Sequence, residues 1–366
     1  MAFRILKKSK KSRARVGALR TAHGMISTPA FMPIATRGVV KTLSAEDITS
    51  LNADIILANT YHLWQRPGLG VLRKYKGLHQ YMRWRGPILT DSGGYQVFSL
   101  SKRRTISEQG VHFSSEIDGR SLFLSPEQAI DIQRAIGSDI MMVLDECPPY
   151  PTTLGYARTS MELTTRWALR ALAHKKKRRI ADQMVFGIVQ GATFPELRSA
   201  HAQTLARMPF DGFAIGGLAV GEPAEQLYAM LEVTIPHLPD SRPHYLMGVG
   251  KPEQIVEAVR RGVDMFDCVI PTRNARHGLI YVWRTADLRG RFYDTIHISR
   301  ARFAADTHPI DVQSSAITSR RYTRAYLRHL FTIGDPLALR LATLQNVSFY
   351  LELMRRVRGA IKRGRL

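Results

Sequence analysis

The sequence predicts an α/β protein, a (β/α)8 barrel, and two observations support this fold. Short apolar runs alternate along the chain with segments of helical periodicity, and the pattern repeats eight times. Because such alternation is typical of parallel strands joined by helical crossovers, eight repeats predict a closed barrel. The length of 366 residues and a hydrophobic content of 45% allow a core of that size. A doubly wound open sheet is the alternative fold.

The expected strands are the apolar runs at 31–35, 54–58, 88–90, 140–144, 185–189, 213–216, 245–247 and 265–270. The expected helices between them include 44–51, 126–136, 156–174, 195–208, 223–238 and 252–261. Several of these helices have proline in the first turn, where its missing N–H costs nothing. A last helix is expected from Asp335-Pro336 onward, since apolar residues continue at helical spacing to Ile361.

Two insertions interrupt the repeat. Residues 100–124 read as a hairpin after the third strand, because apolar and polar residues alternate from Val111 to Ile117 before an Asp-Gly turn. A longer, basic segment lies between the eighth strand and the last helix. The expected domains are therefore the N-terminal strands and barrel in 1–278, an inserted basic subdomain in 279–334 and a closing barrel helix in 335–366.

The chain is strongly basic, with 53 Lys and Arg residues against 30 Asp and Glu residues. A formal net charge of +23 suits a polyanionic partner, and the basic region 270–366 favours a nucleic acid over a membrane. No membrane span or signal-peptide core is found, so a cytoplasmic location is expected. Only Cys147 and Cys268 are present, which excludes a disulfide framework and an all-cysteine metal site. No metal or other cofactor is expected.

Polar or adaptable residues follow the expected strands at their carboxyl ends, where a barrel places its active site. In chain order these residues are Asp91, Asp145, Gln190, Gly217, Met247 and Asp267. Three carboxylates without a metal-ligand set are typical of acid, base and nucleophile roles at an acetal-like carbon. This set predicts cleavage of a glycosidic bond.

The same strand ends suit a flat heterocycle. Asp145 and Gln190 can hydrogen-bond to its edge, and glycine at 217 lets backbone amides approach closely. Tyr95 and Met247 can cover its two faces. Together with the positive charge, these features predict a nucleotide substrate whose base is held in a pocket.

The segment after Asp267 adds cations, because Arg273 and Arg276 follow within ten residues on an expected loop. Considered alone, this segment is explained equally well by a strand-capping carboxylate and a solvated basic loop. The other strand ends favour the functional interpretation, in which an anionic nucleophile lies beside groups that contact phosphates or bases.

At these residues the chain resembles the bacterial tRNA-guanine transglycosylases. The resemblance starts near Ser12-Arg13-Ala14-Arg15-Val16-Gly17, includes Thr28-Pro29-Ala30-Phe31-Met32-Pro33 and Asn59-Thr60-Tyr61-His62-Leu63, and reaches the closing helix. It implies exchange of guanine at the wobble position of tRNA for a 7-deazaguanine, through a covalent enzyme-RNA intermediate. The implied partners are the tRNA anticodon loop and the small base, with no membrane. A homodimer is compatible with the sequence.

The resemblance also implies a role for each matching residue. Asp267 matches the nucleophile that attacks the ribose C1′, and Asp91 matches the general acid/base. Asp145, Gln190 and Gly217 match the readers of the base edge, and Tyr95 and Met247 match the stacking residues. Arg273 and Arg276 match the pair that contacts bases flanking the wobble position. Cys147 and Val220 resemble the bacterial pocket, whose incoming base is preQ1.

One departure from the family pattern concerns a structural zinc. The family has a Cys-x-Cys-x-x-Cys run and a histidine, whereas the matching positions here are Ser314, Ala316, Ser319 and Gln345. None of these can supply a thiolate or an imidazole. We therefore expect a zinc-free subdomain held by the apolar residues Phe292, Tyr293, Ile296, Ile298, Phe303, Ile310, Ile317 and Tyr322.

Two other functions remain open at this point. A non-catalytic tRNA-binding subunit or degenerate paralogue is expected to lose the nucleophile or the acid/base, and Asp267 and Asp91 are both present. A sugar hydrolase on a barrel shares the carboxylates but has no need of the +23 charge.

Overall fold

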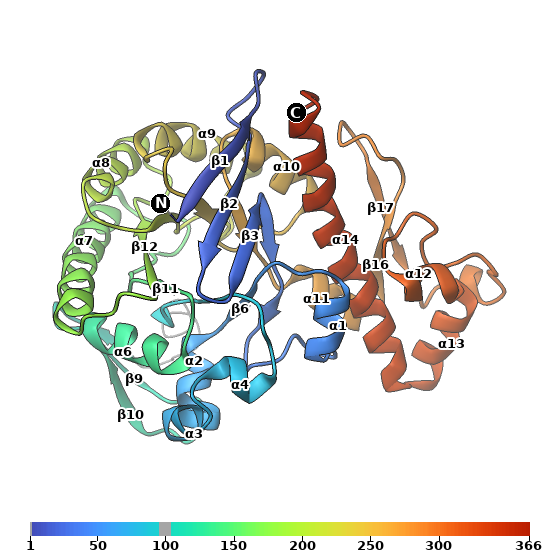
Figure 1. Cartoon of the computed structure of the whole chain (residues 1–366), viewed down its shortest axis with the longest axis horizontal. Helices are drawn as coiled ribbons and strands as arrows, with labels where there is room; N and C mark the ends of the chain where they lie inside the picture. Colours follow the sequence, from blue (N-terminus) through green and yellow to red (C-terminus); the bar gives the residue numbers. More distant parts are fainter. Residues whose placement is uncertain (1, 95–103) are drawn as a thin grey trace.

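A computed structural model describes residues 2–94 and 104–366 of the chain, and its centre is a parallel barrel (Figure 1). Strands β4 (Ala30–Met32) and β5 (Ile34–Ala35) are two halves of one strand interrupted at Pro33. The first half pairs with the eighth barrel strand and the second half pairs with the second, so this strand closes the ring. The remaining strands are β6 (Ile56–Ala58), β7 (Ile88–Thr90), β11 (Ile140–Met142), β12 (Met184–Val189), β13 (Gly212–Ile215), β14 (His244–Leu246) and β15 (Met265–Asp267). The predicted (β/α)8 barrel is confirmed.

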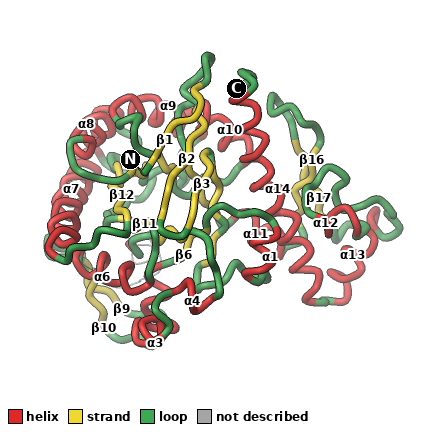
Figure 2. The backbone as a smooth tube through the Cα atoms, in the orientation of Figure 1, coloured by secondary structure: helices red, strands yellow, loops and turns green. Residues whose placement is uncertain are grey.

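Helices surround the strands, and Figure 2 shows α6, α7 and α8 at the outside of the molecule, whereas α14 lies between the barrel and the insertion. Several begin where the sequence predicts, because proline occupies the first turn of α6, α8, α10 and α14, and a polar side chain also caps α6 and α14. In α6, for example, Ser125 and Gln128 form a reciprocal capping box before Ile130 and Ile136 enter the core. The barrel helices are α1 (Ala45–Ser50), α6 (Pro126–Ile136), α7 (Leu154–Lys177), α8 (Pro195–Ala206), α9 (Ala224–Thr234), α10 (Pro252–Arg260) and α14 (Pro336–Lys362).

Short helical segments that the sequence did not predict lie between β6 and β7. They are α2 (Thr60–Leu63), the π-type turn η1 (Trp64–Gly68), α3 (Leu69–Lys74) and α4 (Leu78–Met82). A 3-10 turn, η2 (Ile235–His237), extends α9. Among the described residues, no helix is both long and apolar enough to cross a bilayer.

The residues before the barrel form an antiparallel sheet of β1 (Phe3–Lys8), β2 (Arg15–Thr21) and β3 (Gly24–Thr28) (Figure 1). In this sheet Arg15 is buried and forms an ion pair of 2.6 Å with Asp264, the residue before β15. The β2–β3 turn reaches Asp139, the residue before β11, through His23. The sheet therefore covers the amino ends of the barrel strands and leaves the carboxyl ends open.

The insertion after the third barrel strand is a small antiparallel sheet of β8 (Arg104–Ile106), β9 (Val111–Ser114) and β10 (Ser121–Leu124). Strands β9 and β10 form the predicted hairpin, and β8 adds a third strand to it. The Asp-Gly turn is confirmed by the backbone bond from the Gly119 N–H to the Ser115 carbonyl, 2.9 Å long.

The chain after Asp267 differs from the prediction. The eighth strand ends at Asp267 instead of continuing to Ile270, and Ile270–Arg276 form helix α11 instead of a loop. Pro271 in the first turn explains the helix, because proline favours that position. The insertion then continues as β16 (Leu279–Trp283), β17 (Tyr293–His297), the 3-10 turn η3 (Ala301–Phe303), α12 (Ile317–Arg321) and α13 (Arg324–Ile333).

Most of the apolar residues expected to hold this insertion are buried. Phe292, Ile296, Ile298, Phe303 and Ile310 are each less than a tenth exposed, and the side chains of Tyr293 and Tyr322 are partly buried. The prediction for Ile317 is wrong, because this side chain is 72% exposed at the start of α12.

Candidate active site

The carboxyl ends of the barrel strands surround a cavity of about 450 Å³. Its wall combines carboxylates with apolar side chains from β5, β6, β14 and the loops after β7, β11, β13 and β15. Seven predicted site residues line it: Asp91, Asp145, Cys147, Gly217, Val220, Met247 and Asp267. The structure therefore brings together residues that are up to 176 positions apart, from 91 to 267.

Asp267, the last residue of β15, has one oxygen fixed and one oxygen available. Its Oδ1 accepts hydrogen bonds from the Tyr245 hydroxyl (2.6 Å) and from the Gly248 N–H (2.8 Å). Within the described part of the chain, no other residue donates a hydrogen bond to Oδ2. Burial raises the pKa of Asp267, and Tyr245, Gly248 and its own backbone N–H oppose this effect by stabilising the carboxylate. This geometry suits a nucleophile, because the carboxylate is oriented and Oδ2 is not occupied by a protein donor.

Asp91, directly after β7, is held by the start of helix α2. Its Oδ1 accepts the Thr60 N–H (2.9 Å) and the Gly93 N–H (3.1 Å), and its Oδ2 accepts from the side-chain amide of Asn59. Burial, helped by the nearby charges of Asp267 and Asp145, raises the pKa of Asp91 to about 7, although these donors act in the opposite direction. A carboxyl group with this pKa can give and take a proton at neutral pH.

Asp145 lies on the cavity wall after β11, and Gln190 lies behind it. The Gln190 side-chain amide donates to Asp145 Oδ2 over 2.7 Å, and the Ser92 hydroxyl donates to Oδ1 over 3.4 Å. Burial raises the pKa of Asp145 to about 6. Gln190 is fully buried and does not line the cavity, so the structure places it as a support for Asp145.

Gly216 and Gly217, after β13, have no room for a side chain. A Cβ on Gly216 would stand 2.8 Å from the Gln190 Nε2 atom, and a Cβ on Gly217 would stand 2.3 Å from Gln190 Oε1. Gly217 also has a positive φ of +63°. Only glycine allows the backbone to lie this close to the Asp145–Gln190 pair.

Cys147, Val220 and Met247 complete the predicted part of the wall, whereas Tyr95 lies outside the described residues. Burial and the Asp145 charge raise the pKa of the Cys147 thiol to about 12, so this side chain is neutral. Sequence reasoning missed Glu222, whose carboxylate accepts the N–H groups of Ala219 (2.5 Å) and Val220 (3.0 Å).

Arg273 and Arg276 are on helix α11, beyond the cavity wall. Arg273 is exposed, whereas Arg276 is half-buried and donates to the Thr272 carbonyl over 2.8 Å. Their helix starts three residues after Asp267, so both cations lie on the element that follows the carboxylate.

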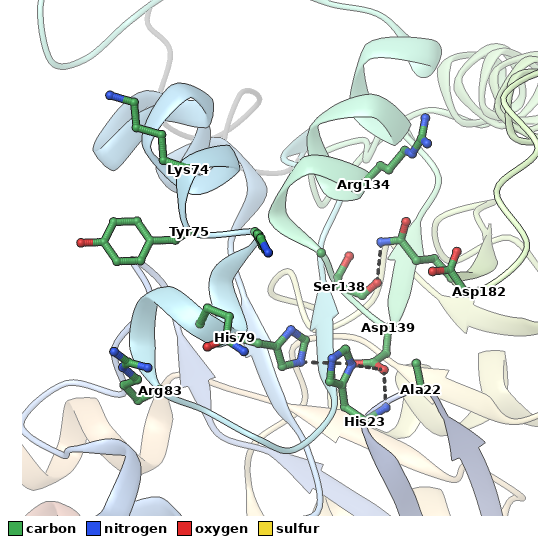
Figure 3. Close-up of a pocket in the computed structure, with 14 residues that line it drawn as sticks. Ala22, His23, Lys74, Tyr75, His79, Arg83, Arg134, Ser138, Asp139 and Asp182 are labelled. Carbon is green, nitrogen blue, oxygen red and sulfur yellow. Dashed lines mark hydrogen bonds and ion pairs between the residues drawn. The ribbon is translucent and has the colours of Figure 1, made fainter.

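A larger cavity, of about 710 Å³, lies near the amino end of β11, at the end of the barrel opposite the carboxylates. Figure 3 shows the residues that line it. At its base Asp139 contacts His23 Nδ1 (2.9 Å) and His79 Nε2 (3.4 Å), a combination of side chains that can bind metals. The two imidazole rings are stacked 3.7 Å apart at an interplanar angle of 16°. A ring nitrogen coordinates a metal in the plane of its ring, so two parallel stacked rings cannot both do so at one ion. The His79 Nε2 atom also lies 3.0 Å from the Gly86 carbonyl. This cluster therefore satisfies the buried Asp139 instead of forming a metal centre.

The positions that match the family's zinc ligands do lie together, but their donor atoms do not fit zinc. Ser314, Ala316, Ser319 and Gln345 are all buried. Ser314 and Ser319 hydrogen-bond to the backbone of Asp311, and Gln345 hydrogen-bonds to its carboxylate. Asp311 Oδ2 accepts from the Gln345 side-chain amide (3.1 Å) and the Trp283 N–H (3.1 Å), and Oδ1 accepts the Gln313 N–H (2.9 Å). Since zinc sites of this kind need four thiolate or imidazole ligands, we assign this region to hydrogen bonding.

A family model and individual relatives both match this chain over nearly its whole length. The family model described as "Queuine tRNA-ribosyltransferase" matches residues 9–366. Queuine tRNA-ribosyltransferases of Bacillus subtilis (strain 168) and Oceanobacillus iheyensis are 48% and 49% identical over 365 residues, which cover 100% of this chain and 93% of each relative. One from Listeria monocytogenes serotype 4a is 50% identical over 364 residues, with the same coverage. The resemblance seen in the sequence motifs is thus confirmed, and the chain belongs to the queuine tRNA-ribosyltransferase family, the tRNA-guanine transglycosylases.

Proposed function

We propose that this chain exchanges guanine at the wobble position of tRNA for preQ1, with Asp267 as nucleophile and Asp91 as general acid/base. Family membership makes it a glycosyltransferase that acts on tRNA. The observation that carries the proposal is the different environment of the two carboxylates in one cavity. Asp267 has an oriented carboxylate with one oxygen available, and Asp91 has a pKa of about 7.

The exchange takes place in two displacements at the ribose C1′. Asp267 Oδ2 forms a bond to C1′ as the C1′–N9 bond to guanine breaks, and the departing base takes a proton from Asp91. The incoming base then gives its N9-type proton to Asp91, bonds to C1′ and releases the Asp267 carboxylate. Two displacements on one carbon preserve its configuration, as in retaining glycosidases.

Base recognition follows from the donors and acceptors on the wall. The Asp145 carboxylate accepts from N1–H and the 2-amino group of guanine, and the Gly217 N–H donates to the 6-carbonyl. Gln190 orients Asp145 from behind, and Met247 covers one face of the base. Tyr95 is proposed for the other face from the sequence alone. The preQ1 assignment is supported by the Cys147 and Val220 side chains on the wall.

The anticodon loop is the proposed RNA partner, contacted by Arg273 and Arg276. Their place on the helix that follows Asp267 supports this role, as does the net charge of +23. A cytoplasmic location is proposed because tRNA is the substrate.

The domain division at residues 278 and 334 stays a proposal, supported by the hydrophobic cluster around Ile298 and Ile310, most of whose buried members lie in 279–334 and the rest in α11 and α14. A homodimer is also proposed. Val312, Ile317 and Ile333 support it, since these apolar side chains of the insertion are 66%, 72% and 59% exposed. Size-exclusion chromatography with light scattering tests it, and a monomer at micromolar concentration contradicts it.

The test of the proposed function is incorporation of labelled guanine into a tRNA with a GUN anticodon, followed by displacement of that label by preQ1. We expect both reactions with the wild-type chain. Binding of tRNA without any exchange would contradict the proposal and favour a non-catalytic tRNA-binding subunit.

A further inference from the structure

Arg198 on helix α8 is fully buried beneath the cavity and bonds to the backbone of two strand ends. Its Nε atom donates to the Ala192 carbonyl over 2.7 Å. Its Nη1 atom donates to the Val189 carbonyl over 3.2 Å and to the Gly216 carbonyl over 2.7 Å. One guanidinium thus joins the end of β12, which leads to Gln190, to the end of β13, which leads to Gly217.

A second residue of helix α8, His201, binds the backbone of Gln190. His201, three residues after Arg198, accepts the Gln190 N–H at its Nδ1 atom over 2.8 Å. Burial and the Arg198 charge lower the pKa of His201 to about 3, so the ring is neutral and can accept this bond. Helix α8 therefore fixes the backbone of both segments that surround Asp145.

The bond to Gly216 also determines where the next N–H points. In a planar trans peptide the C=O and N–H groups point in opposite directions. Because the Gly216 carbonyl points at Arg198, the Gly217 N–H points away from it. The Gly217 N–H is on the side of the Cys147 thiol, where it opposes the rise in the pKa of that thiol, and both residues line the cavity. The peptide therefore turns its N–H toward the cavity and its carbonyl toward Arg198.

Arg198 carries its charge without a bonded carboxylate. Among the described residues, no carboxylate forms an ion pair with Arg198, although the charge of Glu222 acts on it from a longer distance, and the Nη2 atom has no hydrogen-bond partner. Burial lowers the pKa of Arg198 to about 10, so the guanidinium is charged at neutral pH. A buried charge of this kind destabilises the fold, and a hydrogen bond from it polarises the peptide that accepts it.

We propose that Arg198 is a positioning residue for base recognition, which orients and polarises the Gly216–Gly217 peptide so that its N–H binds the 6-carbonyl of the base. The inference rests on the proposed contact between Gly217 and the base. It adds a residue that does not touch the base and acts on it through the Gly216–Gly217 peptide.

The test compares guanine with 6-thioguanine, which keeps N1–H and the 2-amino group but replaces the 6-oxygen by a weaker acceptor. We would measure KM for labelled guanine, kcat, and Ki for 6-thioguanine in the tRNA exchange reaction. The variants are Arg198→Met, which removes charge and donors, and Arg198→Lys, which keeps the charge. The matched control is Arg358→Met. Arg358 also donates to two backbone carbonyls, those of Ser27 and Pro29, but lies outside the cavity wall.

In Arg198→Met we expect KM for guanine to rise about tenfold and the preference for guanine over 6-thioguanine to shrink by a similar factor, while kcat changes less. Arg198→Lys should recover part of the preference, and Arg358→Met should keep all of it. Two results would overturn the inference and assign Arg198 to stability alone. One is an equal loss of affinity for guanine and 6-thioguanine, and the other is loss of the folded state in both Arg198 variants. If the wild-type chain exchanges no guanine, the proposed function itself fails, which is a different result.

Discussion

Removing the Tyr245 hydroxyl should impair Asp267 in a way that depends on pH. In Tyr245→Phe, Asp267 Oδ1 loses a 2.6 Å bond and keeps only the Gly248 N–H. A hydrogen bond to a charged group contributes about 1.5 to 3 kcal/mol, which corresponds to a roughly 10- to 150-fold change in equilibrium. Because the lost donor stabilised the carboxylate, its removal raises the pKa of Asp267 further. Relative to the wild type at the same pH, the variant should therefore exchange guanine more slowly by up to that factor at acid pH. The difference between the two rates should shrink as pH rises.

The assay is initial-rate incorporation of labelled guanine into tRNA between about pH 5 and 9. Tyr350→Phe is the matched control, since Tyr350 is also buried and donates its hydroxyl to a backbone carbonyl, that of Gly250. The control should keep the wild-type pH profile. A Tyr245→Phe enzyme that is slowed equally at every pH would refute the reasoning, because a purely structural defect has no such pH dependence.

Three further outcomes follow from the site and the insertion. Asp91 must be protonated to release guanine, so exchange should decline as pH rises above its pKa of about 7, and a rate that still increases to pH 9 would contradict its assignment as acid. Arg273→Ala or Arg276→Ala should reduce discrimination among anticodon-loop sequences more than total RNA affinity; an equal loss for all RNAs would make them phosphate contacts. The purified protein should contain no stoichiometric zinc, and chelators should leave folding and exchange unchanged, since the four matching positions supply no thiolate or imidazole and the Gln345 Nε2 atom donates to the Tyr281 carbonyl and to Asp311. One tightly held zinc per chain by elemental analysis would overturn this expectation.

The barrel and most of the cavity were predictable because their signals are local. An apolar run followed by a polar residue marks several of the strand ends, and a barrel brings such ends to one mouth. Asp91, Asp145 and Asp267 were predicted on this basis. Asn59 follows β6 in the same way, so the same signal could have identified it as the partner of Asp91.

Other features depend on contacts that no local pattern reveals. Tyr245 lies inside an apolar strand, and only the fold brings its hydroxyl to Asp267. Gln190 follows a strand end, yet the close approach of Gly217 places it behind the wall. Arg198 looks like an ordinary polar residue of a helix until β12 and β13 supply the carbonyls that it binds.

Two predictions were wrong for related reasons. One was that a loop follows Asp267, and the other was that Ile317 is buried. The apolar residues Cys268, Val269 and Ile270 extend the strand pattern, but the backbone turns into α11 once the strand reaches the mouth. Ile317 has a core-like side chain, yet it begins a five-residue helix on the outside of the insertion. Composition alone could not distinguish an exposed apolar surface from a core.

The central claim is that Asp267 bonds covalently to the ribose, and trapping the enzyme–RNA adduct tests it most directly. Wild-type chain incubated with a GUN-anticodon tRNA and quenched in denaturant should give a band that contains both protein and RNA, and mass spectrometry should locate the link at Asp267. Asp267→Ala should give no adduct and no exchange while retaining near wild-type tRNA affinity, because binding depends on cationic contacts. An adduct or near wild-type exchange in Asp267→Ala would contradict the account.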